Sequence, residues 1–341
     1  MTPSHRNQQQ RAVLMLGALG VAALAAILLA CVVGSVALPL REVVAALGNL
    51  LQGAPSTLAA TLLELRLTRA LSAFVVGGSL ALAGVMMQAL LRNPLADPYV
   101  LGVSGGAAVG ALAAMLFFSA LWAIDVAAFC GAILVSVILF LLAHRDLRGG
   151  TSSDGNASLL LLTGVIVASG CGALITLMLS IAPDNRLRGM VFWLIGDLSG
   201  TPLRGLPFLV LGAVLIFTLC AARSINVMAM HADAASTLGI RVGALRKGLF
   251  FCAALLTASA VSGGGSIGFV GLIVPHACRF ALGPDHRLLL PAATLVGGTF
   301  LVLADTLARS VMAPQQLPVG VITALIGVPI FLMQLHHIRK R

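Results

Sequence analysis

The chain has 341 residues, of which 59% are hydrophobic and only 9% are charged, whereas soluble domains carry roughly a quarter charged residues. This composition excludes an ordinary soluble domain and predicts an all-α, polytopic membrane protein. The formal net charge of +10 is then expected to serve membrane orientation and contact with anionic lipid, and no nucleic-acid partner is expected.

Uncharged stretches along the chain predict about ten transmembrane helices, since most exceed the roughly 18 to 20 residues that a helix needs to cross a bilayer. Two stretches are expected to be divided, one by the glycines at 263–266 and one by Pro314 and its neighbours. The uncharged stretches are 12–40, 70–91, 98–124, 126–143, 155–183, 205–222, 248–278 and 310–338.

Charge distribution predicts the topology. Residues 1–11 are expected to form a short cytoplasmic tail, and residues 12–341 a single transmembrane domain with an uncleaved first span. Placing both termini in the cytoplasm puts most of the 21 Lys and Arg residues inside, as the positive-inside rule requires. Segment 183–204 contains MVFWLIGDL, which is too short to span and predicts a short helix on the outer side.

Two polar turns interrupt the apolar pattern on the predicted inner side. RNPLADP at 92–98 is expected to stop a helix, since two prolines bar its continuation and Asn and Asp can bond freed backbone groups. Segment 223–246 contains HADAASTLGIRV, which predicts a short amphipathic helix that ends at Gly239. An ordinary solvated helix would explain the second segment equally well.

Small residues recur at four-residue spacing, which lets helices approach closely in lipid. The six cysteines stand singly within apolar stretches and are expected to be buried thiols, so no metal site and no disulfide framework is predicted. Neither lysine follows a GxxxxG pattern, so any ATP must be bound by another chain. The small-residue sets are Gly102, Gly106 and Gly110, and Gly164, Ala168 and Gly172.

Three stretches in order carry a resemblance to a known family. They are RLTRALSAFVVGGSLALAGVMMQALLRNPLADPYVLGVSGGAAVGA at 66–111, GSIGFVGLIVPHACRFALGPDHRLLLP at 265–291 and LADTLARSVMAPQQLPVGVITALIGVPIFL at 303–332. They are similar to the FecCD-type permeases, the membrane subunits of type II ABC importers for ferric siderophores, haem and cobalamin. The resemblance implies a homodimer of ten-helix subunits in the bacterial inner membrane.

The resemblance also implies partners. Two ATPase subunits would bind MgATP on the cytoplasmic side, and one periplasmic binding protein would deliver the cargo. The permease itself would be no enzyme and would bind no cofactor. The coupling helix that seats in the ATPase would contain Asp233, Ala234, Ala235 and Gly239.

Family positions further imply a docking site and a gate. Arg66, Arg69 and Arg309 match arginines that pair with acidic residues of the binding protein; interfacial anchoring is the alternative. Asp305, four residues before Arg309, could instead pair with it inside the chain.

The cytoplasmic gate would fall at Asn156, Ala157 and Ser158. A helix N-cap at Asn156 or Ser158 explains the same residues.

The expected cargo is haem. The predicted pathway spans contain Thr163, Ser169, Thr176 and Met178 but no cluster of basic groups, which disfavours an anionic siderophore and an amide-rich corrinoid. Cobalamin and ferric siderophores are the alternatives.

Two rival functions belong to other classes. An intramembrane serine protease could use a GxSG motif around Ser104 with His276 as its base. A secondary transporter would need ionisable residues for ion coupling, and the spans contain almost none.

Overall fold

The computed structural model describes residues 3–34, 48, 57–118, 120–143, 153–199, 203–230 and 232–339. Within these ranges every regular element is a helix, which confirms the all-α class. The helices in chain order are α1 (Pro3–Val32), α3 (Leu58–Leu91), the short η1 (Pro98–Leu101), α4 (Val103–Phe117), α5 (Leu121–Ala143), α6 (Ser153–Ser180), α7 (Asp184–Ile195), α8 (Gly205–Met230), α9 (Ala232–Thr237), α10 (Val242–Gly264), α11 (Val270–Leu282), α12 (His286–Ala308) and α13 (Val319–Arg339).

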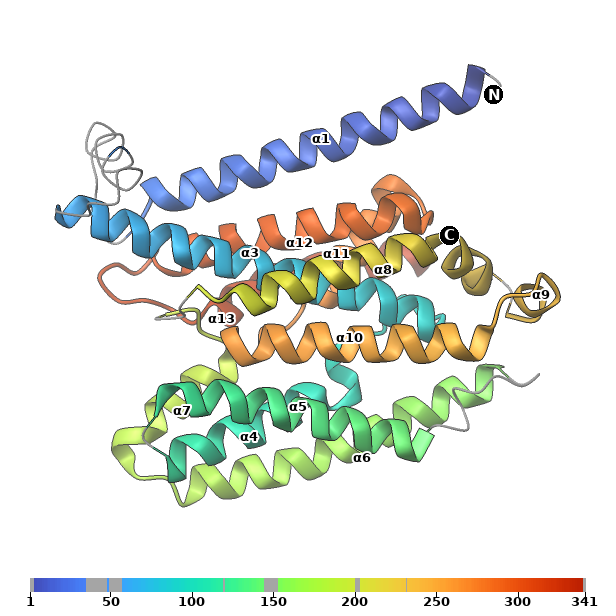
Figure 1. The fold of residues 1–341 in the computed structure, drawn as a ribbon. Helices are drawn as coiled ribbons and strands as arrows, with labels where there is room; N and C mark the ends of the chain where they lie inside the picture. The colour runs from blue at the N-terminus through green and yellow to red at the C-terminus, as the bar shows by residue number, and fades with distance from the viewer. Residues whose placement is uncertain are drawn as a thin grey trace.

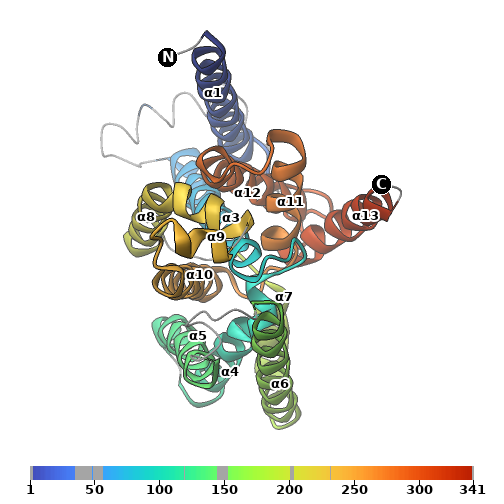
Figure 2. The same cartoon turned by 90° about the vertical axis from the view of Figure 1, so that its right-hand side faces the viewer.

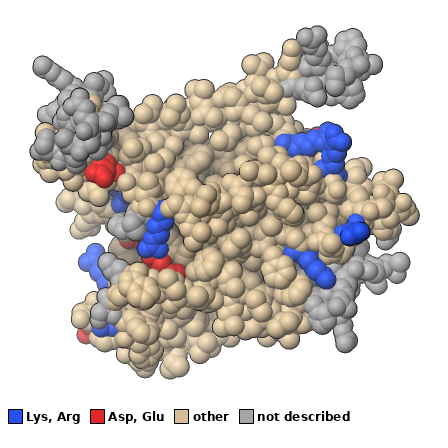
Figure 3. Space-filling model, in the orientation of Figure 1, with Lys and Arg blue, Asp and Glu red and all other residues tan. Residues whose placement is uncertain are grey.

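Ten of these helices are suited to a bilayer. Seven are long and apolar enough to cross it, namely α1, α3, α5, α6, α8, α10 and α12, and α4, α11 and α13 are shorter and apolar. Figure 3 shows the consequence on one face, where charged side chains lie toward the two ends and the middle is uncharged. The predicted breaks near 263–266 and 313–316 are confirmed as the α10–α11 and α12–α13 connections.

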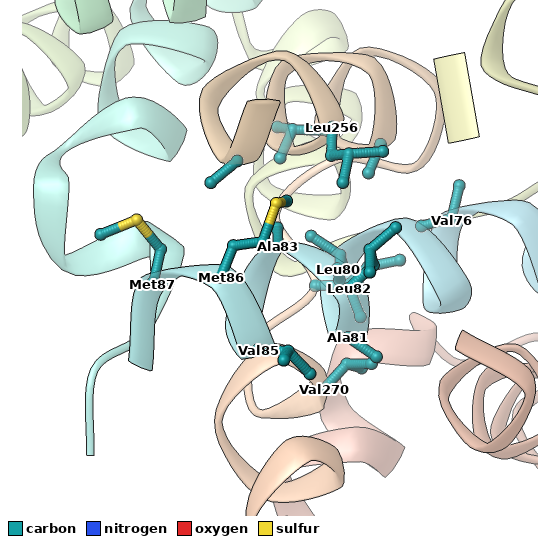
Figure 4. Close-up of a cluster of buried hydrophobic side chains, with 14 of the residues drawn as sticks. Val76, Leu80, Ala81, Leu82, Ala83, Val85, Met86, Met87, Leu256 and Val270 are labelled. Carbon is teal, nitrogen blue, oxygen red and sulfur yellow. The ribbon is translucent and has the colours of Figure 1, made fainter. Parts of the chain in front are cut away.

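The 34-residue helix α3 runs through the centre of the bundle. It packs against α12, α10 and α11, and it also contacts α1 and α8. Its side chains from Val76 to Met87 lie between Leu256 of α10 and Val270 of α11 (Figure 4). Such close packing, more than the hydrophobic effect, holds helices together in lipid.

Glycines set the helix spacing as the small-residue pattern predicts. A Cβ on Gly84 of α3 would overlap the carbonyl group of Gly271 in α11. A Cβ on Gly106 of α4 would likewise overlap Gly131 of α5. A Cβ on Gly102 would lie 3.2 Å from the backbone nitrogen of Ala168 in α6, so the two predicted small-residue sets meet at Gly102, while Gly106 and Gly110 pack against α5.

The helices form two groups. Helices α4, α5 and α6 pack on one another, and α10 links them to the larger group around α3 (Figure 2). Along the long axis, the start of α1, the end of the chain and α9 lie at one end of the bundle, and α7 lies at the other (Figure 1).

Two helix boundaries differ from the sequence prediction. Helix α3 begins at Leu58, so Arg66 and Arg69 lie two to three turns inside it and not at its start. Helix α8 continues to Met230, which leaves only 231–241 between α8 and α10 in place of the expected 223–246. In both cases a charged residue within a helix hid its continuation, because long basic side chains can lie along a helix and still reach polar surroundings. The short helix expected within 183–204 is α7.

The 92–98 turn ends helix α3, and its Asn and Asp side chains bond backbone groups as the sequence predicted. Arg92 adopts a left-handed conformation with φ of 50° at the end of α3. The side chain of Asn93 accepts a hydrogen bond from Leu95 N at 2.9 Å, and Asp97 accepts one from Tyr99 N at 2.7 Å. The turn leads into η1, where the Tyr99 hydroxyl accepts a hydrogen bond from Ile267 N in the α10–α11 break.

Candidate functional site

The three arginines predicted to dock a binding protein gather at the end of the bundle opposite α9, around Asp305 of α12. Arg69 Nε lies 3.0 Å from each carboxylate oxygen of Asp305, and its Nη2 lies 2.8 Å from Oδ1. Arg309 Nε lies 3.6 Å from Asp305 Oδ2, so the pairing within α12 that the sequence suggested is present but is the weaker one. Asp305 is buried between the two.

Arg66 and Arg309 also hold the end of α1. Arg66 Nη1 donates to the carbonyl oxygens of Cys31 and Val32, both at 3.0 Å, and Arg309 Nη2 donates to that of Ala30. The last carbonyls of a helix have no partner within it, and a cation there is favourable. A Cβ on Gly34 would lie 2.8 Å from the Arg66 guanidinium, so a larger residue at this position would have to displace the end of the Arg66 side chain.

The contacts of the three arginines within the chain limit how far each can reach a binding protein. The exposed fractions of Arg66 and Arg309 are only 7% and 5%, because their guanidinium groups point at α1. The Arg69 side chain is 13% exposed, and its Nη1 reaches exposed Gln316 Oε1 at 2.8 Å and Ser199 Oγ at 3.4 Å. The docking role therefore stays a prediction, and Arg69 is the member of the trio with a hydrogen-bonding edge near the surface.

The short helix predicted within 223–246 is present as α9, and its role in coupling stays a prediction. Gly239 has φ of +79°, and its N–H donates to Ser236 O at 3.0 Å while Ile240 N donates to Ala235 O at 3.0 Å. These two bonds are a Schellman motif, which ends a helix on a left-handed glycine. Ala235 is buried, so α9 is fastened to the bundle; the side chains of Asp233 and Ala234 lie outside the described part.

The predicted gate residues Asn156, Ala157 and Ser158 lie in the first turns of α6, and their side chains are outside the described part of the chain. Helix α6 begins at Ser153. Neither Asn156 nor Ser158 is therefore the N-cap, and that alternative is wrong. Sequence reasoning missed the earlier start because Ser153, Asp154 and Gly155 are typical of a loop.

The residues of the protease hypothesis belong to two different helices, Ser104 to α4 and His276 to α11. The glycines around Ser104 are accounted for by packing, since a Cβ on Gly105 would lie 2.9 Å from Cys171 Cβ of α6. Among the described residues, no group of three or more His, Cys, Asp or Glu side chains is placed to hold a metal.

The fold defines a polytopic, all-helical membrane protein, and comparison with known proteins identifies its family. Residues 22–337 match the FecCD transport family, and the chain belongs to that family. It is therefore the permease subunit of an ABC importer of the cytoplasmic membrane, a dimeric permease that works with an ATPase and a binding protein. It contains no catalytic domain.

Several relatives are similar over most of their length. The cobalamin import system permease protein BtuC of Halobacterium salinarum is 42% identical over 82% of this chain and 74% of its own. The hemin transport system permease protein HmuU of Yersinia pestis is 41% identical over 79% of this chain and 81% of its own. The vitamin B12 import system permease protein BtuC of Escherichia coli O9:H4 is 37% identical over 81% and 84%.

A solved structure supports the same fold. A metal-chelate type ABC transporter in an inward-facing conformation superimposes with a TM-score of 0.80 at 28% identity, covering 95% of this chain and 99% of its own. Relatives of nearly equal identity thus carry different cargoes by name, and the family alone leaves the choice between haem and cobalamin open.

Proposed function

We propose that this permease moves haem from the periplasm to the cytoplasm of a bacterium by alternating access. Two copies enclose the pathway, two ATPase subunits bind MgATP inside, and one periplasmic binding protein docks outside. In this arrangement both termini and α9 are cytoplasmic, and Asp233 to Gly239 transmit closure of the ATPases. The side chains Asn156, Ala157 and Ser158 close the inner gate.

The observation that carries haem as cargo is the surface of α6. From residue 161 onward, where its side chains are described, the exposed large side chains are all aliphatic, and 155–183 contains no charged residue in the sequence. The hydroxyl groups of Ser169 and Thr176 donate to carbonyl oxygens of their own helix at 2.9 Å, so their protons are not offered to a ligand. The exposed aliphatic residues of α6 are Leu162, Val165, Ile166, Leu174 and Leu177.

This surface suits a flat, largely apolar porphyrin. An anionic siderophore would leave its charge without a partner, and a corrinoid with many amides would leave donors unpaired. Met178 contacts the hydrophobic core from its partly buried position, so it contributes less to the lining than its sequence position suggested. In our proposal α6 and α13, which lie at the margin with α7 between them (Figure 2), face the second copy.

Cobalamin is the second candidate, favoured by the relatives named for it at 42% and 37% identity. The test is uptake into proteoliposomes that contain permease, ATPase and binding protein, with haem, cobalamin and a ferric siderophore assayed in parallel. We expect haem uptake that requires hydrolysable ATP. Cobalamin uptake without haem uptake would contradict the cargo assignment and leave the importer assignment intact.

A further inference from the structure

A cavity of about 610 Å³ lies at the end of the bundle that carries α9. It is formed by the C-terminal ends of α3, α8 and α11 and by the start of α12. Its polar lining is supplied by Gln88, Arg92, Asn226, Arg279, Asp285 and His286. We call it the cytoplasmic socket.

The buried wall of the socket presents two hydrogen-bond acceptors. His286 is 4% exposed, and its Nδ1 lies 2.6 Å from Asn226 Oδ1. That amide oxygen also accepts from His286 N, while Asn226 Nδ2 donates to Asp285. Because an amide oxygen only accepts, we assign the ring proton to Nδ1. His286 Nε2 is then an acceptor, and no described residue bonds to it.

Gln88 supplies the second acceptor. It is 3% exposed, and its Nε2 donates to Leu272 O at 3.3 Å. This bond fixes the amide orientation and leaves Oε1 without a partner among the described residues. Buried polar groups are normally paired, so two unpaired acceptors on residues that line one cavity favour a donor-bearing group that binds there.

The socket also carries positive charge. Arg279 lines it, and its guanidinium group forms no hydrogen bond or ion pair with a described residue. Arg92 lines it too, and its Nη2 donates to Met230 O at 3.3 Å. The one carboxylate in the lining, Asp285, already accepts from Asn226 Nδ2 and from Arg287 N. The lining therefore lacks an anion to pair with Arg279 and hydrogen-bond donors for the two acceptors.

We propose that the socket receives a loop of the ATPase partner that carries an acidic side chain. Its carboxylate would pair with Arg279 and Arg92, since the guanidinium fork matches a carboxylate. Backbone N–H groups of the same loop would donate to Gln88 Oε1 and His286 Nε2. The proposal rests on the importer function and adds a second contact to the one through α9.

The position of the socket favours a protein occupant over a lipid. Met230, which lines it, ends α8, and α9 starts at Ala232. Seen from this end of the bundle, α9 lies beside the ends of α3 and α8 (Figure 2). A surface that binds α9 therefore lies next to the residues that line the socket.

The test measures the affinity of the ATPase for the full-length permease in nanodiscs. We expect Arg279→Glu to weaken it about tenfold or more, because reversal places like charges together, and Arg279→Lys to retain most of it. Arg287→Glu is the matched control, since Arg287 is exposed at the start of α12 but does not line the socket. Equal losses for the two reversals would overturn the proposal.

A second readout guards against misfolding of the variant. p-Benzoylphenylalanine in place of Pro284, which also lines the socket, is expected to cross-link to the ATPase in the assembled complex. Cross-links to lipid alone would contradict the proposal and assign the socket to a headgroup. If the unaltered permease bound no ATPase, the importer function itself would fail; if only the Arg279 and cross-linking results failed, the socket alone would be refuted.

Discussion

Arg69 of α3 holds both carboxylate oxygens of Asp305 of α12, with its Nε 3.0 Å from each. The two residues are 236 positions apart, so their contact ties the central helix to the C-terminal part of the bundle. Arg309 lies on the other side of the same carboxylate. Arg66 and Arg309 extend the link to the end of α1.

Removal of the Asp305 carboxylate should destabilise the permease strongly. Asp305→Ala leaves the charges of Arg69 and Arg309 unpaired in a buried site, which costs about 3–5 kcal/mol. Thermal unfolding of the solubilised permease should therefore show a clearly lower midpoint. Asp184→Ala, at an exposed position on α7, is the control and should unfold like the unaltered chain.

Docking of the binding protein can be tested by neutralising Arg69 and Asp305 together. Arg69→Gln combined with Asp305→Asn removes the closer pair together and keeps hydrogen-bonding groups. Arg309 loses only its weaker contact with Asp305 and keeps its bond to the Ala30 carbonyl oxygen, so the fold should be less destabilised than by Asp305→Ala. Affinity for the binding protein should fall about tenfold and lose part of its salt dependence, while assembly with the ATPase is unchanged. Unaltered affinity in surface plasmon resonance would remove Arg69 from the docking site.

Coupling should depend on the end of α9. Gly239→Ala forces a residue with a Cβ into φ of +79°, at a cost of about 1–2 kcal/mol. The Schellman motif should loosen, and ATP hydrolysis by the complex should become less responsive to loaded binding protein. Gly20→Ala in α1, where a Cβ would meet nothing within 4 Å, is the matched control. An equal response in both variants would argue against a coupling role for this turn.

Asp97 makes stability depend on pH. It lies in the turn between α3 and α4, and its side chain is partly buried. Burial raises the pKa of this carboxyl group from 3.8 to about 6. The unfolded chain therefore ionises first, so the free energy of unfolding falls as pH rises from about 4 to about 6 and is level above that.

Asp97→Asn keeps an oxygen that can accept from Tyr99 N and cannot ionise. It should remove this decline and stabilise the permease by about 1–2 kcal/mol at pH 7.5. Unfolding midpoints measured from pH 4.5 to 7.5 check this. A variant that keeps the same pH dependence as the unaltered chain would show that Asp97 is not its source.

Local patterns predicted the fold well and long-range contacts poorly. Uncharged stretches predicted about ten helices, because the bilayer requires long apolar segments. The glycines at four-residue spacing predicted close helix packing, and the structure shows α5 as the partner of Gly106 and Gly110. Gly239 predicted the end of α9, since a left-handed helix end favours glycine. The start of α3 was missed because Glu64, Arg66 and Arg69 suggested a loop, although all three lie within a helix.

For the candidate sites too, the sequence predicted residues but not their long-range contacts. Arg66, Arg69 and Arg309 were found by resemblance, but nothing local to them signals that two of them hold the carbonyl groups of α1. The cytoplasmic socket joins residues of four helices. Its chemistry depends on which atoms lack partners, and that is a property of the folded chain alone.

The central claim is that α9 faces the cytoplasm, where an ATPase can reach it. It is tested most directly by labelling single cysteines, at Ser236 on α9 and at Ser199 beyond α7, in a variant whose six native cysteines are replaced. With a membrane-impermeant maleimide on intact cells whose outer membrane is permeabilised, we predict labelling at position 199 and protection at position 236 until the inner membrane is opened. Labelling at position 236 from outside would contradict the account.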